Sequence, residues 1–346
     1  MDLSANLEHL ARVAQHPFAL LWIFLLSSVL LIWRLECLTR RGMEGTLLGS
    51  LIMPYCSGLG NVLFVFILLR ANGPGSEMLI NCFVNNITNL TLILGLCACF
   101  GGLTVSLNRR KISSSRKISA RQRQRDEAAL RESEEHRLHV LFSLLAGIFF
   151  TVILWALGRD GEIDGNDGMV LIGIFLFWQA FHIYEVMKNR VRENRRSFDP
   201  FLIVDFFLIL AAGVGIFWST ETLVEWIMNQ EGAFVGEESL GWITGWLMVL
   251  PNAGLALYYV YRRRPEVVYA SQVGDGHICI PLCIGLFAMA QTISVEPLFF
   301  STAITILLGA YLLHGIFLFG LRRLPAWFGV LLVATYGAFL FLGLVE

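Results

Sequence analysis

The chain has 346 residues, of which 56% are hydrophobic and 15% are charged, and its mean hydropathy is +0.64. Soluble domains are about 45–50% apolar and about 25% charged, so this composition excludes an ordinary soluble enzyme or binding domain. The 26 Lys and Arg residues nearly balance the 27 Asp and Glu residues, which gives no sign of a nucleic-acid partner. We therefore expect an integral membrane protein whose main partner is the lipid bilayer.

Apolar runs recur along the whole chain, and many of them reach the roughly 18 residues that are typical of a transmembrane helix. A helix needs ~20 residues to cross a bilayer, so the longer runs must tilt, break or protrude. The pattern predicts an all-α polytopic membrane protein with about ten spans in two five-helix repeats. The predicted spans cover residues 17–34, 44–70, 76–106, 138–158, 168–188, 200–219, 239–261, 266–292, 297–320 and 325–344.

The distribution of positive charge predicts the orientation of these spans. If the N-terminus lies outside, the inner connections hold 23 of the 26 Lys and Arg residues. Cytoplasmic loops carry such an excess of Lys and Arg, whereas the outer connections are acidic, as at residues 160–164 and 231–238. Removing one span would destroy this alternation. We therefore predict that both termini lie on the extracytoplasmic side of a cell membrane or inner membrane.

One long basic stretch, residues 108–137, separates the third span from the fourth, and we interpret it as a cytoplasmic loop. It divides the first repeat into residues 1–107, with spans one to three, and residues 138–188, with spans four and five. Residues 189–346 form the second repeat. Basic stretches beside a membrane attract anionic lipid. A plain topology anchor that continues as a solvated charged helix explains the same residues.

The third span carries polar side chains at regular spacing. Asn81, Asn85 and Asn89 follow one another at steps of four, which places them on one stripe of a helix. Polar groups are costly in a bilayer, and they usually face the bundle interior or a water-filled pathway. A single asparagine often hydrogen-bonds a neighbouring helix. The whole stripe beside a proline-broken span instead favours an ion or solute site.

That proline-broken span is the second one. Pro54 has no N–H group and so leaves a backbone carbonyl without its helical donor. Ser57 and Asn61 follow at i and i+4, and they therefore share one face of the helix below the break.

The second repeat follows the same plan in its seventh and eighth spans. The seventh span carries Pro251 and Asn252, and the eighth carries Asp275 and His277 within a glycine-rich polar stretch. Five spans separate the two units, and an odd number inverts the second unit relative to the first. Broken helices in corresponding positions of two inverted repeats indicate the midplane site of a transporter.

Two isolated ionisable residues lie within other spans. Asp205 lies within two turns of a predicted inner end, where it can snorkel to the interface or cap the helix. His314 lies in the middle of the ninth span, where it can reach a backbone carbonyl. Either residue could also be functional, because ionisable groups inside a membrane often are.

The segment from Asn81 to Leu96, together with Pro54, resembles the calcium/cation antiporter superfamily, which includes the sodium/calcium exchangers. The family pattern is G-N-V-x-G-S-N-I-F-N/D-I-L-x-x-L-G-L, and the match is weaker in the second repeat. Residues 158–168 and 219–225 also resemble connecting segments of the family. The resemblance covers nearly the whole chain, and it implies a secondary antiporter with ten spans in two inverted repeats.

The chain departs from the family at the two central glutamates, which follow the prolines. Tyr55 and Asn252 occupy these positions, and Asp275 is the only nearby carboxylate, with His277 close in sequence. Ca²⁺ takes six to eight oxygen ligands and commonly several carboxylates. A site with at most one negative charge suits a monovalent cation, or a proton-coupled step through His277. The predicted cation ligands are Ser57, Asn61, Asn85, Asn89, Asn252, Asp275 and His277.

These observations predict a secondary active cation transporter that is monovalent or proton-coupled rather than an efficient Ca²⁺ exchanger. We expect no organic cofactor, and Na⁺, K⁺, Ca²⁺ and H⁺ all remain candidate substrates. The alternative is a transport-dead scaffold or sensor that retains the antiporter fold. An intramembrane enzyme finds no support, because the sequence has no HExxH motif, no GxSxG motif and no paired intramembrane aspartates.

Overall fold

The computed structural model describes residues 16–40, 58–101, 103–104, 120–190, 201–230 and 235–345. These residues are almost entirely helical, and nine of the described helical segments are long and apolar enough to cross a membrane. The predicted second span is described only from Gly58, where helix α5 (Leu59–Arg70) follows. The predicted all-α polytopic fold class is confirmed, and the chain is an integral membrane protein.

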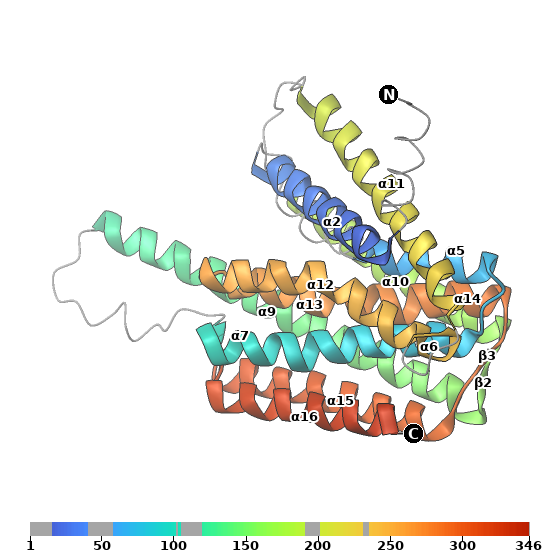
Figure 1. The fold of residues 1–346 in the computed structure, drawn as a ribbon. Coiled ribbons are helices and arrows are strands. Elements are labelled where there is room, and N and C mark those ends of the chain that lie inside the picture. The colour runs from blue at the N-terminus through green and yellow to red at the C-terminus, as the bar shows by residue number, and fades with distance from the viewer. Residues whose placement is uncertain are drawn as a thin grey trace, which may run out of the picture. The chain divides into compact units, whose positions relative to one another are not determined.

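The helices follow one another in the same order in both halves of the chain (Figure 1). Each half has two helices, then an α–π–α segment, then two more helices. The first half comprises α2 (Pro17–Arg40), α5, α6 (Gly75–Ile87), η2 (Thr88–Ile93), α7 (Leu94–Gly101), α9 (Ala120–Leu157) and α10 (Gly165–Arg190). The second half comprises α11 (Phe201–Met228), α12 (Leu240–Tyr261), α13 (Pro265–Ile278), η5 (Cys279–Ile284), α14 (Gly285–Ala290), α15 (Pro297–Gly320) and α16 (Ala326–Val345).

The contacts among these helices form two compact units, and each unit takes residues from both halves of the sequence. The first unit comprises Met1–Asn85, Leu157–Pro251 and Ile278–Glu296, and the second comprises Asn86–Ala156, Asn252–His277 and Pro297–Glu346. The predicted boundaries at residues 107, 137 and 188 concern the sequence repeats, and they stay a prediction.

In the first unit, α11 packs against α2 and α5. An ion pair joins α11 to α2, because Arg34 Nη1 lies 3.2 Å from Asp205 Oδ1 and Asp205 is only 1% exposed. A second pair joins α11 to α5, with 2.8 Å between Arg70 Nη1 and Glu221 Oε1, and Arg70 is 76% exposed. Asp205, predicted to snorkel or to cap its helix, therefore neutralises a cation on the neighbouring helix.

Helix α10 of the first unit begins with a reciprocal capping box. The Asp164 carboxylate accepts the backbone N–H of Asp167 at 3.0 Å and that of Asn166 at 2.8 Å, while the Asp167 carboxylate accepts the Asp164 N–H at 3.0 Å. The N–H groups of Asp167 and then Asn166 hold the pKa of Asp164 below its usual range. This connection also contains β2 (Glu162–Ile163), which pairs with β3 (Ile293–Ser294) in an antiparallel register. The cap fixes where the fifth predicted span starts.

In the second unit, α16 packs against η2 and α7. The closest approach is between two glycines, since a Cβ added at Gly95 would lie 2.9 Å from the Gly329 carbonyl oxygen. The strand β1 (Leu103–Thr104) pairs with β4 (Arg323–Leu324), so the end of the third span is held beside the turn between α15 and α16. Two small residues therefore let the helix that carries the asparagine stripe lie directly against α16.

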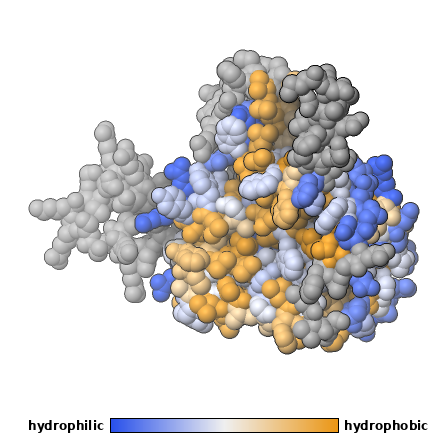
Figure 2. All heavy atoms as spheres, viewed as in Figure 1, coloured by the Kyte–Doolittle hydropathy of each residue, from blue (hydrophilic) through white to orange (hydrophobic). Residues whose placement is uncertain are grey.

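Large apolar side chains are exposed on helices of both units. Phe177 of α10 is 76% exposed, Phe319 of α15 is 75% exposed and Val330 of α16 is 63% exposed. Figure 2 shows hydrophobic residues over much of the visible surface. Soluble monomers rarely expose large apolar patches, and lipid acyl chains are the surroundings that these exposed side chains fit.

We expect Asp205→Leu to destabilise the protein, because it leaves the Arg34 guanidinium buried without its partner. Breaking a buried ion pair costs about 3–5 kcal/mol, which lowers the thermal midpoint by about 5 °C or more. The double variant Arg34→Met/Asp205→Leu should recover at least half of that loss in detergent-solubilised protein. Glu221→Ala, in the exposed pair, is the control, and its expected cost is below about 1 kcal/mol. Wild-type stability of Asp205→Leu would contradict the assignment.

Candidate cation site

The structure distributes the predicted ligands over both units. Asn61 and Asn85 belong to the first unit, and Asn89, Asn252, Asp275 and His277 belong to the second. Ser57, like Pro54 and Tyr55, lies outside the described residues.

A buried carboxylate lies at the centre of the polar residues of the second unit. Asp275 of α13 has no exposed surface, and its Oδ2 accepts a hydrogen bond of 2.9 Å from Asn89 Nδ2 of η2. The same oxygen accepts a short hydrogen bond from Asn252 Nδ2 of α12. Three segments that are far apart in the sequence therefore meet at one carboxylate oxygen. We call Asn89, Asn252, Asp275 and the adjacent Gln272 the Asp275 cluster.

Gln272 lies one helical turn before Asp275 on α13, and both side chains contact Asn252 of α12. Its Nε2 donates to the Asn252 backbone carbonyl at 3.2 Å and contacts Ser271 Oγ at 3.0 Å. Gln272 was not among the predicted ligands, although its i, i+3 spacing from Asp275 was a signal that could have found it.

Within the described part of the chain, Asn252 Oδ1 and Gln272 Oε1 of the Asp275 cluster accept no hydrogen bond, and both side chains are fully buried. Leaving a buried acceptor unsatisfied costs about 1–3 kcal/mol. Their amide nitrogens donate to Asp275 and to the Asn252 carbonyl, so each amide oxygen is turned away from those contacts. Amide oxygens with no donor are ready ligands for a hard cation.

The polar residues of the first unit mainly join neighbouring helices. Asn81 Nδ2 donates to Thr244 Oγ1 of α12 at 2.9 Å, and Thr244 Oγ1 donates to the Leu240 carbonyl at 2.6 Å. Asn85 Nδ2 donates to Asn61 Oδ1 of α5 at 3.3 Å. These contacts are interhelical hydrogen bonds of the kind that asparagine often forms in membranes. The asparagine stripe therefore serves two purposes, because Asn81 and Asn85 join helices while Asn89 contacts a carboxylate.

A second buried carboxylate, Glu77, caps a helix of the first unit. It is 5% exposed, and its Oε2 accepts the backbone N–H of Gly241 at 2.6 Å, in the first turn of α12. A negative charge at a helix N-terminus is favourable. Glu77 was not predicted as functional, and this contact gives it a structural role.

His277 contacts a different helix from those that Asp275 contacts, although the two residues are close in sequence. Its Nε2 lies 2.9 Å from the Ser143 carbonyl oxygen of α9, and its ring meets that of Phe150 edge-on at 5.5 Å. Asp275 and His277 are two residues apart, and such residues point to different sides of a helix. The structure thus places His277 against α9, whereas Asp275 meets Asn89 and Asn252.

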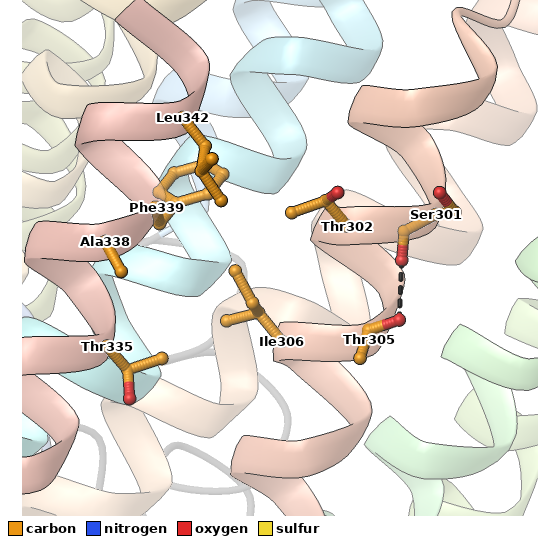
Figure 3. Close-up of a pocket in the computed structure, with 8 residues that line it drawn as sticks. All are labelled: Ser301, Thr302, Thr305, Ile306, Thr335, Ala338, Phe339 and Leu342. Atoms are coloured by element: carbon orange, nitrogen blue, oxygen red, sulfur yellow. Dashed lines mark hydrogen bonds between the residues drawn. The ribbon is translucent and has the colours of Figure 1, made fainter.

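A cavity of about 400 Å³ lies between α15 and α16 (Figure 3). Four hydroxyl residues line it, and three of them donate to a carbonyl of their own helix: Ser301 to Leu298, Thr305 to Ser301 and Thr335 to Leu331. These three hydroxyls are thereby satisfied, and the other lining residues except Thr302 are apolar, so the cavity offers a cation mainly carbon atoms. It does not resemble an ion site.

Residues 17–184 match the family model for the sodium/calcium exchanger protein. Solved structures of the sodium-calcium exchanger NCX_Mj have the same fold. NCX_Mj soaked with 2.5 mM Na⁺ and 0.1 mM Sr²⁺ gives a TM-score of 0.63 at 16% identity, over 92% of this chain and 94% of that chain. NCX_Mj soaked with zero Na⁺ and Ca²⁺ gives a TM-score of 0.62 at 16% identity, over 92% of this chain and 95% of that chain. The comparison with curated proteins found no match.

We expect Gly276→Ala to disturb the Asp275 cluster through overpacking. A Cβ at this position would meet the Tyr311 hydroxyl and would lie 3.0 Å from Asn86 Oδ1. Overpacking of a buried site costs about 1–3 kcal/mol, so the thermal midpoint should fall. The control is Gly309→Ala on α15, where no described atom lies within 4 Å and helix propensity favours alanine. An equal effect of the two substitutions on the thermal midpoint would contradict this prediction.

Proposed function

We infer that this chain is a cation antiporter of the sodium/calcium exchanger family and that it exchanges a monovalent cation or a proton at the Asp275 cluster. The observation that carries the proposal is one fully buried carboxylate held by amides from two other segments, with Asn252 where the family has a glutamate. Efficient Ca²⁺ exchange is not the function that this cluster supports best.

The charge of the cluster favours a monovalent ion. A cation that leaves water for a buried site loses hydration energy, and opposite charges in the site must compensate for it. Asp275 supplies one negative charge, which neutralises a monovalent ion fully and a divalent ion by half. Asn89, Asn252 and Gln272 are neutral, so they add dipoles but no charge.

The ligand atoms of the cluster suit an alkali cation. The Asp275 carboxylate, Asn252 Oδ1 and Gln272 Oε1 are hard oxygen donors. The amide nitrogens of Asn89 and Asn252 contact Asp275 Oδ2, so a cation that binds this oxygen displaces one amide. A proton can occupy the same carboxylate, and proton coupling through Asp275 is then competition between H⁺ and the metal ion. His277 offers a separate proton site beside α9.

Asp275→Asn should abolish cation exchange in proteoliposomes. At ~4 Å and an effective dielectric constant of ~20, the lost charge interaction is about 4 kcal/mol, which corresponds to a fall in cation affinity of about 700-fold. Asp160→Asn, a substitution of the same kind at an exposed residue, is the control and should transport like the wild type. Fluxes of radioactive Na⁺, Rb⁺ and Ca²⁺ and a pH-sensitive dye report the substrate.

The proposal fails if wild-type proteoliposomes carry none of these ions under any imposed gradient. That result would favour the transport-dead scaffold or sensor. Unchanged exchange in Asp275→Asn would show that another site binds the ion.

Asn252→Glu should raise Ca²⁺ uptake, because it adds a second carboxylate beside Asp275 and makes the cluster doubly negative. We expect at least a tenfold gain in Ca²⁺ uptake relative to uptake of monovalent ions, equivalent to about 1.4 kcal/mol. Asn252→Gln has the same length without the charge, and it should show no such gain. A similar ratio of Ca²⁺ to Na⁺ uptake in both variants would mean that charge at position 252 does not determine selectivity.

A further inference from the structure

A fully buried histidine on α15 bridges two segments of the second unit. His314 Nε2 lies 2.9 Å from the Leu90 carbonyl oxygen in η2, and His314 Nδ1 lies 3.3 Å from the Tyr269 hydroxyl in α13. The His314 ring meets the rings of Tyr269 and Phe328 nearly edge-on, at 5.7 Å and 6.2 Å. The sequence predicted that His314 could reach a backbone carbonyl, and the structure identifies that carbonyl.

The π-helical turn explains why the Leu90 carbonyl is open to a side chain. In an α-helix the Leu94 amide would donate to Leu90, four residues before it. Here the Leu94 amide is directed at the carbonyls of Asn89 and Thr91 instead. The Leu90 carbonyl therefore lacks its α-helical donor, and the His314 ring occupies the position of that donor.

The two contacts determine the tautomer of the neutral ring. A carbonyl oxygen only accepts hydrogen bonds, so Nε2 must carry a proton. In the neutral ring Nδ1 then has no proton, and it accepts the hydrogen of the Tyr269 hydroxyl. One neutral histidine thus satisfies a carbonyl on η2 and a hydroxyl on α13.

Both contacts adjoin residues of the Asp275 cluster. Leu90 follows Asn89 directly in the chain, and Tyr269 lies six residues before Asp275 on the same helix. The histidine therefore ties the segment that supplies the Asn89 amide to the helix that supplies the Asp275 carboxylate, which are themselves joined at 2.9 Å.

We propose that His314 is a positioning residue of the cation site, which holds the π-helical turn so that Asn89 stays in register with Asp275. The proposal rests on the proposed function of the Asp275 cluster. A π-helical turn contains one residue more than an α-helical turn, so its relaxation would rotate Asn89 by ~100° relative to one flank of the helix. Without His314 the Leu90 carbonyl loses its side-chain donor, while its α-helical donor is already directed elsewhere, and this favours that relaxation.

The positioning role has a consequence that simple core packing would not have. A rotated Asn89 no longer contacts Asp275 Oδ2, so the size and ligand number of the site change. His314 should therefore affect the affinity for the cation and the discrimination between Na⁺ and K⁺. A histidine that only filled the core would change the amount of folded protein and leave both quantities constant.

The experiment compares His314→Gln with His314→Phe in proteoliposomes, with exchange normalised to monodisperse protein. Gln can still donate from its amide to the Leu90 carbonyl, and Phe cannot. We expect His314→Phe to lower the apparent Na⁺ affinity about tenfold and to shift the Na⁺/K⁺ ratio, while His314→Gln stays within about threefold of wild type. The control is Thr151→Val on α9, whose buried hydroxyl donates to Gly147 of its own helix.

Affinity and selectivity equal to wild type in folded His314→Phe would overturn the proposal, as would a Gln variant as impaired as the Phe variant. If His314→Phe does not fold, Tyr269→Phe replaces it as the test. That variant removes one of the two contacts, and we expect about a threefold loss of Na⁺ affinity. No loss would overturn the proposal. Wild-type exchange that requires Asp275 keeps the proposed function intact in either case.

Discussion

A bilayer offers no water to its interior, so a buried polar group in this chain is costly unless it finds a partner within the protein. The two π-helical turns show how the fold meets this constraint. A side chain from another segment contacts a carbonyl in each turn: His314 contacts the Leu90 carbonyl in η2, and the Cys82 thiol donates to the Cys279 carbonyl in η5 at 3.4 Å. Both turns occupy the third position of their half of the chain. π-helical turns often mark functional sites, and here each is fixed by a directed side-chain contact.

The same constraint acts on the charged groups, and it separates structural carboxylates from the candidate ligand. Asp205 is neutralised by an arginine, and Glu77 accepts an N–H group at the start of a helix. Asp275 is held by neutral amides, which stabilise a carboxylate without cancelling its charge. Asp275 differs from Glu77 in that its two donors are side-chain amides from two separate segments, η2 and α12.

Hydropathy and the positions of Lys and Arg were enough to predict the fold class, since each span is a local pattern of about 20 residues. Sequence spacing also identified Asn89, Asn252 and Asp275, which the structure brings together. It could not assign partners. The asparagine stripe was predicted on the assumption of a continuous α-helix. The π-helical segment η2 begins at Thr88, so the residues after it point in other directions than an α-helix would give them. Whether an asparagine meets a hydroxyl, an amide or a carboxylate depends on which helices pack together, and local sequence does not contain that information.

At the proposed cation site, Asn252 occupies the position of a glutamate in the family pattern that this chain resembles, and an amide there has different requirements from a carboxylate. Two carboxylates within hydrogen-bonding distance repel each other, so one of them must bind a cation or a proton before the site is stable. An amide at position 252 instead donates to Asp275, and the cluster holds together with no ion bound. A cation must then compete with this hydrogen bond, and only a weakly hydrated ion of low charge can do so at modest cost. On the proposed function, an amide at position 252 therefore favours an ion of lower charge than a pair of carboxylates would.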